Sequence, residues 1–326
     1  MRIVWALMAT ALLLFSETLH PSARLEVPGI VTDIALEGNR LYVATDEGSV
    51  TLFDLDTLKL LGRLRLPETL DGAGKKIPMR IESVDVRKGR VLVTAIGKNG
   101  FRQVWLFGKG KVRSLVSPEK RMMVRWARFA GDGHVVLLTY GAEILRYSLE
   151  EGGILYRKEV SGSTPGDMSV DGEGRYAYVA DEGGEVWKID LASGERVGNL
   201  PSKHLDQIFS IAHAGGVMVT GGRDRKVVVL YRGRRYTLWS GFPVYCVGLS
   251  PDGGRGVYSD GDAQLLKLFD TATGRIEAVL EGHRSVVNRI LFAGNGRLVT
   301  SEQGPAVLIW DVNSTRKERD GKDERE

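Results

Sequence analysis

Histidine and cysteine are the side chains through which a protein most often holds a metal ion or forms a covalent intermediate. Five histidines are scattered along the 326 residues, at positions 20, 134, 204, 213 and 283. None of the intervals between them has the spacing typical of zinc or copper ligands. The single cysteine, Cys246, excludes an intrachain disulfide, and it lies in the apolar run Val244-Tyr245-Cys246-Val247, where we expect a core residue. The sequence therefore gives no support for a metal ion or another cofactor.

Nucleophilic and acid–base catalysis receive as little support. The chain has no Gly-x-Ser-x-Gly motif, and we expect Ser161-Gly162-Ser163 to be a loop. A pair of catalytic carboxylates leaves no local pattern, because turns can bring together acids that are distant in the sequence. Nothing in the sequence singles out such a pair. We therefore expect that the protein is not an enzyme, and we keep a hydrolase as the alternative.

One pattern returns along the whole chain. It consists of an apolar strand, a turn of Gly, Asp or Asn, a second apolar strand ending in Thr or Ala, an acidic or Gly turn, and a third strand. Seven third strands can be placed, at residues 50–54, 104–107, 144–147, 186–190, 227–231, 266–270 and 307–311. The units are about 42 residues long, as in four-stranded propeller blades, and the helical period of 3.6 is nearly absent. The sequence predicts an all-β, seven-bladed β-propeller.

The two ends of this repeat array complement each other. A fourth strand follows the third in the first six units, whereas the seventh unit lacks one. A spare apolar strand at residues 24–27 precedes the first unit, and residues 25–34 resemble residues 280–290. Because an open ring would expose unpaired sheet edges, we expect the N-terminal strand to close the last blade.

The first residues have the order of a secretory signal peptide. Arg2 precedes an apolar stretch over residues 3–15, and a polar, turn-prone segment over residues 16–23 follows. The predicted organisation is a signal peptide at 1–23, a propeller at 24–315 and a charged, disordered tail at 316–326. We expect an exported, periplasmic protein without stable membrane insertion after cleavage; an uncut membrane anchor is the alternative.

The charge of the chain points away from nucleic acid. The formal net charge is +4 and the isoelectric point about 9.0, and the basic residues are spread along the chain instead of forming one stripe. We expect a monomer that does not bind nucleic acid.

The last unit resembles a WD40 repeat. It has Gly282-His283 before its first strand and Trp310-Asp311 at the end of its third, and other units retain Phe53-Asp54, Ile189-Asp190 and Phe269-Asp270 at the Trp-Asp position. The resemblance implies a propeller that binds other proteins. The family's hydrogen-bond network of His, Asp, Ser or Thr and Trp is expected to be incomplete, because the turn of the last unit is Glu302-Gln303-Gly304-Pro305, without the usual Asp.

A narrower resemblance concerns exported propellers. Residues 80–86, the insert at 97–102 and the segment 221–226 are similar to periplasmic accessory proteins of the bacterial nitrate reductase system. This resemblance implies an accessory factor whose partner is a periplasmic redox enzyme or its maturation factor. A propeller hydrolase or lactonase with a site at the channel mouth is the alternative. An outer-membrane assembly scaffold would share the same binding logic, but such a scaffold usually has a lipid anchor, which we do not expect here because no cysteine follows the apolar stretch.

Two candidate partner-binding surfaces follow from the repeat. One position early in each first strand should lie at the channel mouth, and across the seven units it is occupied by Thr32, Glu82, Arg125, Gly166, Phe209, Tyr245 and Asn288. Of these we select Glu82, Arg125, Phe209, Tyr245 and Asn288 as binding residues, since aromatic residues and Arg carry most binding energy at interfaces. The second surface is the basic turn with Arg223, Arg225 and Lys226. The alternatives are that Phe209 and Tyr245 fill the channel and that the turn is an ordinary solvated hairpin.

Overall fold

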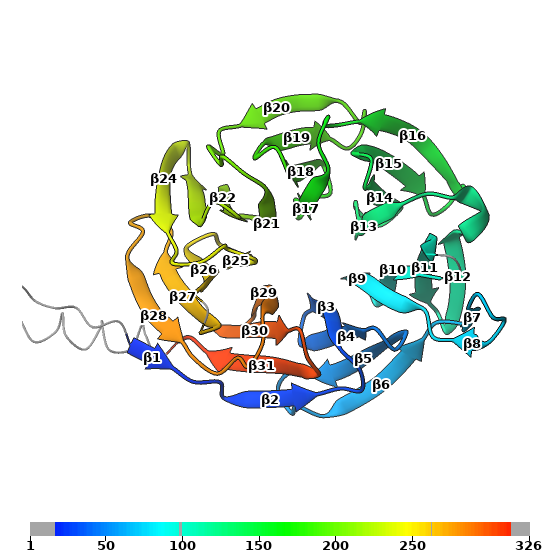
Figure 1. Ribbon diagram of the computed structural model, residues 1–326, viewed down its shortest axis with the longest axis horizontal. Coiled ribbons are helices and arrows are strands. Elements are labelled where there is room, and N and C mark those ends of the chain that lie inside the picture. The colour runs from blue at the N-terminus through cyan, green and yellow to red at the C-terminus, as the bar shows by residue number, and fades with distance from the viewer. Residues whose placement is uncertain (1–16, 98–99, 262, 314–326) are drawn as a thin grey trace, which may run out of the picture.

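Seven β-sheets are arranged around a central channel (Figure 1). The computed structural model describes residues 17–97, 100–261 and 263–313. The one helical element that lies wholly within these residues is the short 3-10 turn η2 (Pro118–Lys120). The prediction of an all-β, seven-bladed propeller is confirmed. No described helix has the length and hydrophobicity needed to cross a membrane.

Each of the first four blades is a four-stranded antiparallel sheet whose strands run in sequence order from the channel to the rim. Blade one contains β3 (Val31–Glu37), β4 (Arg40–Thr45), β5 (Ser49–Asp54) and β6 (Leu60–Arg65). Blade two contains β9 (Arg80–Arg87), β10 (Arg90–Ile96), β11 (Arg102–Gly108) and β12 (Lys111–Val116). Blade three contains β13 (Val124–Phe129), β14 (His134–Thr139), β15 (Glu143–Ser148) and β16 (Gly153–Glu159). Blade four contains β17 (Pro165–Val170), β18 (Tyr176–Asp181), β19 (Val186–Asp190) and β20 (Arg196–Leu200).

The remaining blades continue the same order. Blade five contains β21 (Ile208–Ala214), β22 (Val217–Gly222), β23 (Lys226–Tyr231) and β24 (Arg234–Trp239). Blade six contains β25 (Val247–Leu249), β26 (Arg255–Asp260), β27 (Leu265–Asp270) and β28 (Ile276–Leu280). Blade seven is built from β29 (Val287–Ala293), β30 (Arg297–Glu302) and β31 (Ala306–Asp311), which come from the end of the chain.

The core lies between neighbouring blades. The second strand of a blade is buried on both faces, and in β4 the side chains of Leu41, Tyr42 and Val43 are inaccessible to solvent or nearly so. This arrangement explains the unbroken apolar runs in the sequence, because a strand covered on both sides needs no polar alternation. Tyr42 packs with Ile81 of blade two in one of these inter-blade clusters.

The N-terminal strand closes the ring as predicted. Strand β2 (Ala23–Glu26) pairs antiparallel with β31, with Ala23 opposite Ile309, and supplies the missing fourth strand of blade seven.

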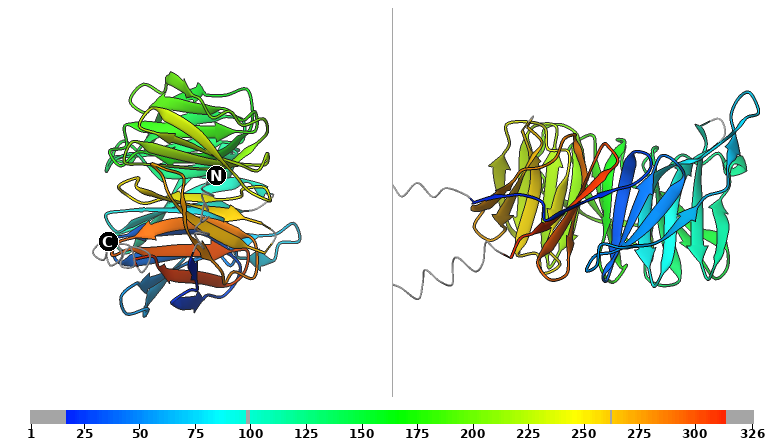
Figure 2. Two further views of the ribbon diagram at one scale, coloured as in Figure 1. Left: turned by 90° about the vertical axis from the view of Figure 1, so that its left-hand side faces the viewer. Right: turned by 90° about the horizontal axis from the view of Figure 1, so that it is seen from below.

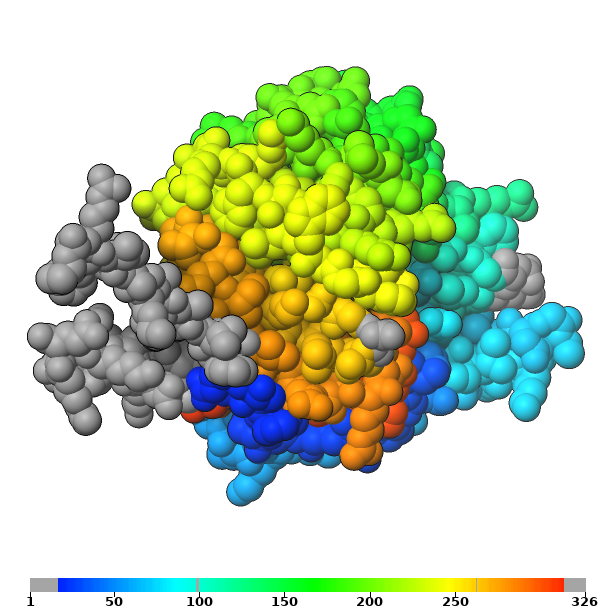
Figure 3. All heavy atoms as spheres, turned by 60° about the vertical axis from the view of Figure 1, so that its left-hand side comes forward, coloured from blue at the N-terminus to red at the C-terminus, as the bar shows by residue number. Residues whose placement is uncertain are grey.

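A second N-terminal strand has no counterpart in the sequence prediction. Strand β1 (Glu17–Leu19) pairs in parallel with β28 and gives blade six a fifth strand. Leu19 is only 8% exposed, and Ser22 donates a backbone hydrogen bond of 2.8 Å to Ile309. Figure 3 shows this dark blue segment lying against the orange surface of blade six. Residues 17–26, which we call the N-terminal strap, therefore join blades six and seven. The rest of the predicted signal peptide, and the predicted tail, lie outside the described residues.

A hairpin interrupts the connection between blades one and two. Its strands are β7 (Thr69–Leu70) and β8 (Lys76–Ile77), which pair only with each other. The right-hand view of Figure 2 shows that this hairpin projects beyond one face of the disc.

Candidate functional site

The side chains at the channel mouth are placed there by β-bulges. In the innermost strands of blades one to five and blade seven, one residue is left without a partner on the second strand. A bulge of this kind redirects the side chain of the extra residue. The bulged residues are Thr32, Glu82, Arg125, Gly166, Phe209 and Asn288. They are six of the seven channel-mouth positions that the repeat predicts, and four of them were selected as binding residues. We call the face on which the innermost strands begin the mouth face.

In blade six the selected residue lies just ahead of the innermost strand. The backbone N–H groups of Tyr245 and Cys246 both donate to the hydroxyl of Ser259, at 3.0 and 3.3 Å. In the other blades the paired second strand accepts backbone N–H groups of the innermost strand. Here the Ser259 hydroxyl accepts them. Tyr245 therefore occupies the equivalent place, although β25 begins only at Val247.

Two of the five selected residues are engaged within the protein. Glu82 accepts a hydrogen bond of 2.8 Å from Arg102. Asn288 donates to the carbonyl of Val31 at 2.9 Å and accepts from the hydroxyl of Ser301. Such contacts hold the side chains of Glu82 and Asn288 in place but leave them fewer groups for a partner.

Arg125 lies beside an aromatic ring. Its guanidinium is 4.9 Å from the centre of the Tyr140 ring, and Arg102 lies 4.4 Å from the same centre. Two cations thus share one ring through cation–π contacts. Arg125 remains half-buried at the mouth face.

The other two selected residues form an aromatic cluster. The rings of Phe209 and Tyr245, from adjacent blades, are stacked with centres 5.1 Å apart. Phe242, which was not selected from the sequence, lies 6.2 Å from Tyr245. Phe242 and Tyr245 are each 39% exposed, so the cluster opens to solvent at the mouth face and is not sealed in the channel. The only sequence signal for Phe242 was an apolar residue in the turn-prone segment Ser240-Gly241-Phe242-Pro243.

A hollow of about 390 Å³ lies on the opposite side of the mouth. Its lining comes from the loops and strand starts of blades one, two and seven, and includes Ile30, Thr32, Arg80, Glu82, Asn288 and Gln303. The mouth face therefore combines an aromatic cluster on one side with a mixed polar hollow on the other.

The basic turn is only partly available to a partner. Arg223 and Arg225 are exposed. The ammonium of Lys226 instead lies 3.1 Å from the Asp224 carboxylate and donates to the carbonyl of Lys203. Asp224 also lies 2.8 Å from Nδ1 of the buried His204. Half of this turn is therefore structural.

The hydrogen-bond network of the last blade is complete, contrary to the expectation from its sequence. Trp310 Nε1 donates to the Thr300 hydroxyl at 2.8 Å, and Thr300 lies 2.8 Å from His283 Nε2. His283 Nδ1 lies 3.0 Å from Glu302, which takes the place of the usual Asp. In the matching network of blade five the acid, Asp224, stands four residues after Thr220, whereas Glu302 stands two residues after Thr300.

Burial fixes the protonation state of this network. Loss of solvent lowers the pKa of His283, and loss of solvent likewise lowers the pKa of His204 in blade five. A neutral imidazole has one donor and one acceptor. This matches a series of hydrogen bonds in which Thr300 donates to Nε2 of His283 and Nδ1 of His283 donates to Glu302. The two histidines are therefore structural and not catalytic.

Three carboxylates inside the channel join neighbouring blades. Asp33, Asp85 and Asp167 each accept one backbone N–H from the next residue in the chain, at 3.0, 2.9 and 2.8 Å. Each also accepts an N–H from the innermost strand of the following blade, at 2.9, 2.6 and 3.1 Å. Innermost strands of different blades share no backbone ladder, so these N–H groups need side-chain acceptors. The carboxylates of the channel are thus used for structure.

Arg289 reaches across the channel. Its Nε donates to Asp33 of blade one at 2.8 Å, and its Nη1 lies 3.7 Å from Asp167 of blade four. Blades four and seven lie on opposite sides of the ring (Figure 1). The Trp126 ring lies about as close to Arg128, at 5.0 Å, as to Arg289, at 5.3 Å. This charged layer separates the mouth from the other half of the channel.

Within the described residues, no group of three or more His, Cys, Asp and Glu side chains is placed to hold a metal ion. Cys246 is buried, and burial raises the pKa of its thiol to about 12. A thiol in this state is a poor nucleophile because the thiolate is the reactive form.

Two family profiles match parts of the chain. The profile of the family described as outer membrane protein assembly factor BamB matches residues 93–241, which is less than half of the sequence. The LVIVD repeat matches residues 28–55, in blade one. A search of curated protein sequences gave no match.

Among solved structures, the β-propeller domain of Cps50 (Swd1) from Myceliophteria thermophila is similar, with a TM-score of 0.72. The match covers 90% of this chain and 99% of that domain at 15% sequence identity. At this identity the likeness concerns the fold. The chain is a seven-bladed β-propeller, with similarity over its central blades to the outer membrane assembly factor family.

Proposed function

We propose that the protein is an exported, non-catalytic scaffold that holds a partner protein at its mouth face. The observation that carries this proposal is the exposed cluster of Phe209, Phe242 and Tyr245, which two adjacent blades build around one stacked pair. Aromatic side chains that are rigid and partly exposed supply much of the binding energy at protein interfaces. Stacking holds the Tyr245 ring in place before a partner arrives, so little conformational entropy is lost on binding.

The charged residues around the cluster favour an acidic partner surface. Arg223 and Arg225 are exposed in the adjacent hairpin, and Arg125 lies across the mouth. Charges at the rim of an interface mainly accelerate association, and their effect weakens as salt concentration rises. We therefore propose that the aromatic cluster provides most of the binding affinity and that the basic turn increases the rate of association.

The partner we propose is a periplasmic redox enzyme, such as nitrate reductase, or its maturation factor. This finer assignment, in which the protein corresponds to the nitrate reductase accessory protein NapL, rests on the similarity of residues 80–86, 97–102 and 221–226, of which Lys98 and Asn99 lie outside the described residues. The partial match to the assembly factor family supports the broader proposal of a scaffold that handles proteins, and it favours an outer-membrane assembly partner as the second candidate. The hydrolase alternative has no comparable support, since each channel carboxylate is held by two backbone N–H groups.

The test compares the wild type with a variant that lacks two aromatic side chains of the cluster and with a control variant. The variant Phe209→Ala/Tyr245→Ala should reduce capture of the partner from periplasmic extract at least about tenfold, as expected for the loss of interface hot spots. Leu61→Ala is the control, because Leu61 is 51% exposed but lies on the rim strand β6 of blade one. Each partner that mass spectrometry identifies is then purified. The wild type and the variants should bind it with affinities in the same order as their capture from the extract. Equal capture by the wild type and the double variant would refute the proposed surface.

Export is tested separately. Fractionation of cells producing the full chain should place the protein in the periplasm. Recovery of the protein with the cytoplasmic fraction would refute export without bearing on the mouth face.

A further inference from the structure

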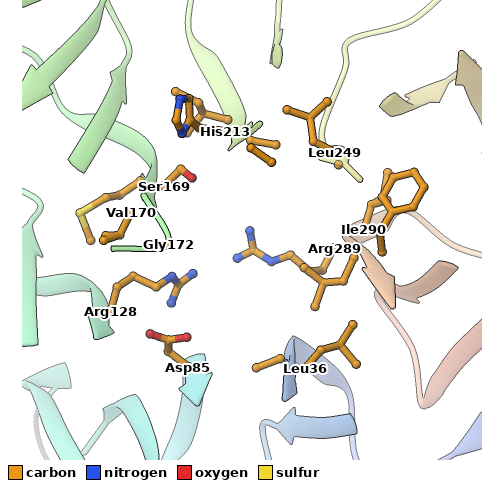
Figure 4. A pocket seen from close by; sticks show the side chains of 18 of the residues that line it. Leu36, Asp85, Arg128, Ser169, Val170, Gly172, His213, Leu249, Arg289 and Ile290 are labelled. Carbon is orange, nitrogen blue, oxygen red and sulfur yellow. The ribbon is translucent and has the colours of Figure 1, made fainter. Parts of the chain in front are cut away.

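The end of the channel opposite the mouth contains a second cavity. This cavity, which we call the far cup, has a volume of about 460 Å³ and is lined by the last residues of all seven innermost strands. A volume of this size is within the range of small-molecule sites. The charged layer around Arg289 forms its floor, so the far cup and the mouth are separate sites (Figure 4).

Apolar side chains form part of the wall of the far cup, beside polar groups. Leu36, Val170, Leu249 and Ile290 face the cavity from four different blades (Figure 4). Such a wall favours a ligand with an apolar body, because burial of that body releases water from both surfaces. The polar groups inside the cup, and not the apolar side chains of its wall, determine which ligand is selected.

Four polar side chains retain hydrogen-bonding groups that point into the cup. Arg289 binds Asp33 only through Nε, and Arg128 donates Nη1 to the carbonyl of Ala127 while its Nη2 remains 3.8 Å from Asp33. Within the described part of the chain, Ser169 and the ring nitrogens of His213 have no hydrogen-bond partner in the protein. The His213 ring is held in place by stacking on Tyr178, with centres 4.1 Å apart. These groups come from blades three, four, five and seven and converge on one space.

The charges around the floor decide which kind of ligand fits. The guanidiniums of Arg128 and Arg289 face the carboxylates of Asp33, Asp85 and Asp167, which gives two positive and three negative formal charges, a sum of −1. The floor therefore offers free N–H donors without a net positive charge. Oxygen acceptors are favoured there, whereas a ligand with a full negative charge adds repulsion from the carboxylates.

We propose that the far cup binds a neutral, ring-sized organic molecule whose carbonyl or hydroxyl oxygens accept hydrogen bonds from Arg128 and Arg289. The apolar body of this molecule packs against Leu36, Leu249 and Ile290. Ser169 and His213 contact its polar edge. This binding is independent of the partner proposed for the mouth face.

The test uses three probes of the same shape and different charge. Benzamide is neutral, benzoate is an anion and benzylamine is a cation at pH 7.5, and binding of each to the full-length protein is measured by saturation-transfer NMR titration. Benzamide should bind about fivefold or more tightly than benzoate, which the carboxylates repel, and than benzylamine, which has no oxygen to accept from Arg128 and Arg289; this is the factor expected for one added or lost hydrogen bond. Tighter binding of benzoate than of benzamide would overturn the proposed ligand class, and no binding of any probe would overturn the site.

Substitutions locate the site without disturbing the ion pairs. Ser169→Leu fills the cup from blade four and should abolish benzamide binding. His213→Phe keeps the stack on Tyr178 but removes both nitrogens, and should weaken benzamide binding about fivefold. Thr32→Val, on the mouth face, is the matched control and should bind as the wild type does. Unchanged binding in Ser169→Leu, with an unchanged melting temperature, would show that the probe sits elsewhere and would overturn the proposal.

Discussion

The guanidinium of Arg289 lies 2.8 Å from the carboxylate of Asp33, and this ion pair joins the innermost strands of the last and the first blade. Asp33 is 1% exposed, and its other oxygen already accepts the backbone N–H of Val84 in blade two. The pair thus contributes to ring closure on the channel side, while strand β2 closes the ring at the rim.

We expect Arg289→Met to lower the free energy of unfolding by about 3–5 kcal/mol, because it leaves a buried carboxylate without its partner. Urea denaturation measures the loss. The control is Arg157→Met, which removes the exposed pair with Glu143 and should cost less than about 1 kcal/mol. Adding Asp33→Asn to Arg289→Met should restore part of the stability. A loss for Arg289→Met no larger than that of the control would contradict the role of the pair.

The N-terminal strap should be part of the stable fold. Leu19 packs with Leu280 and Trp310 in the cluster between blades six and seven. We expect Leu19→Ala to cost about 2–3 kcal/mol, as for the truncation of other buried leucines. A chain starting at Arg24 should lose at least as much stability as Leu19→Ala, because it also lacks the hydrogen bonds of Ser22 to Ile309. Thermal unfolding of chains that start at Glu17 and at Arg24 provides the comparison, and equal melting temperatures would show that β1 is dispensable.

Gly166 should tolerate no side chain. A Cβ atom at this bulge would lie 1.9 Å from the carbonyl oxygen of Ile208 in the next blade. We expect Gly166→Ala to destabilise the protein by about 1–3 kcal/mol, since backbone must move to make room. Gly62→Ala in the rim strand β6 is the control, because nothing lies within 4 Å of its Cβ position. Chemical denaturation of both variants decides the matter, and similar midpoints would count against the close packing of blades four and five.

The buried histidines predict a loss of stability in acid. Burial lowers the pKa of both His204 and His283 in the folded protein below the value of about 6.5 expected for the unfolded chain. The unfolded chain therefore binds more protons below this pH, so stability is fully present above about pH 6.5 and decreases as the pH falls further. The variant His204→Gln/His283→Gln should be less stable at pH 7.5, and its stability should depend less on pH between 7.5 and 5.5. Urea denaturation midpoints across this pH range measure the difference. The same dependence of the midpoint on pH in the wild type and the variant would refute the contribution of the two histidines.

Much of the fold could be predicted from the sequence. The number of blades and the exchange of a strand between the two ends follow from local patterns, because each blade repeats the same apolar strands and turn residues. The channel-mouth positions could also be selected, since the bulge recurs at one place in the repeat. What these patterns determine is the position of each residue within its own blade.

Relations between blades were decided only by the tertiary structure. The replacement of the usual Asp by Glu302, the parallel pairing of β1, and the meeting of Phe242 with the stack of Phe209 and Tyr245 have no local signature. The contact of Arg289 with Asp167 joins residues on opposite sides of the ring. The sequence by itself determined a ring of repeated sheets, because strand alternation and turn chemistry act over a few residues. Contacts between side chains of different blades depend on how the ring closes and packs. Only the folded molecule therefore decides which charged and aromatic groups face one another.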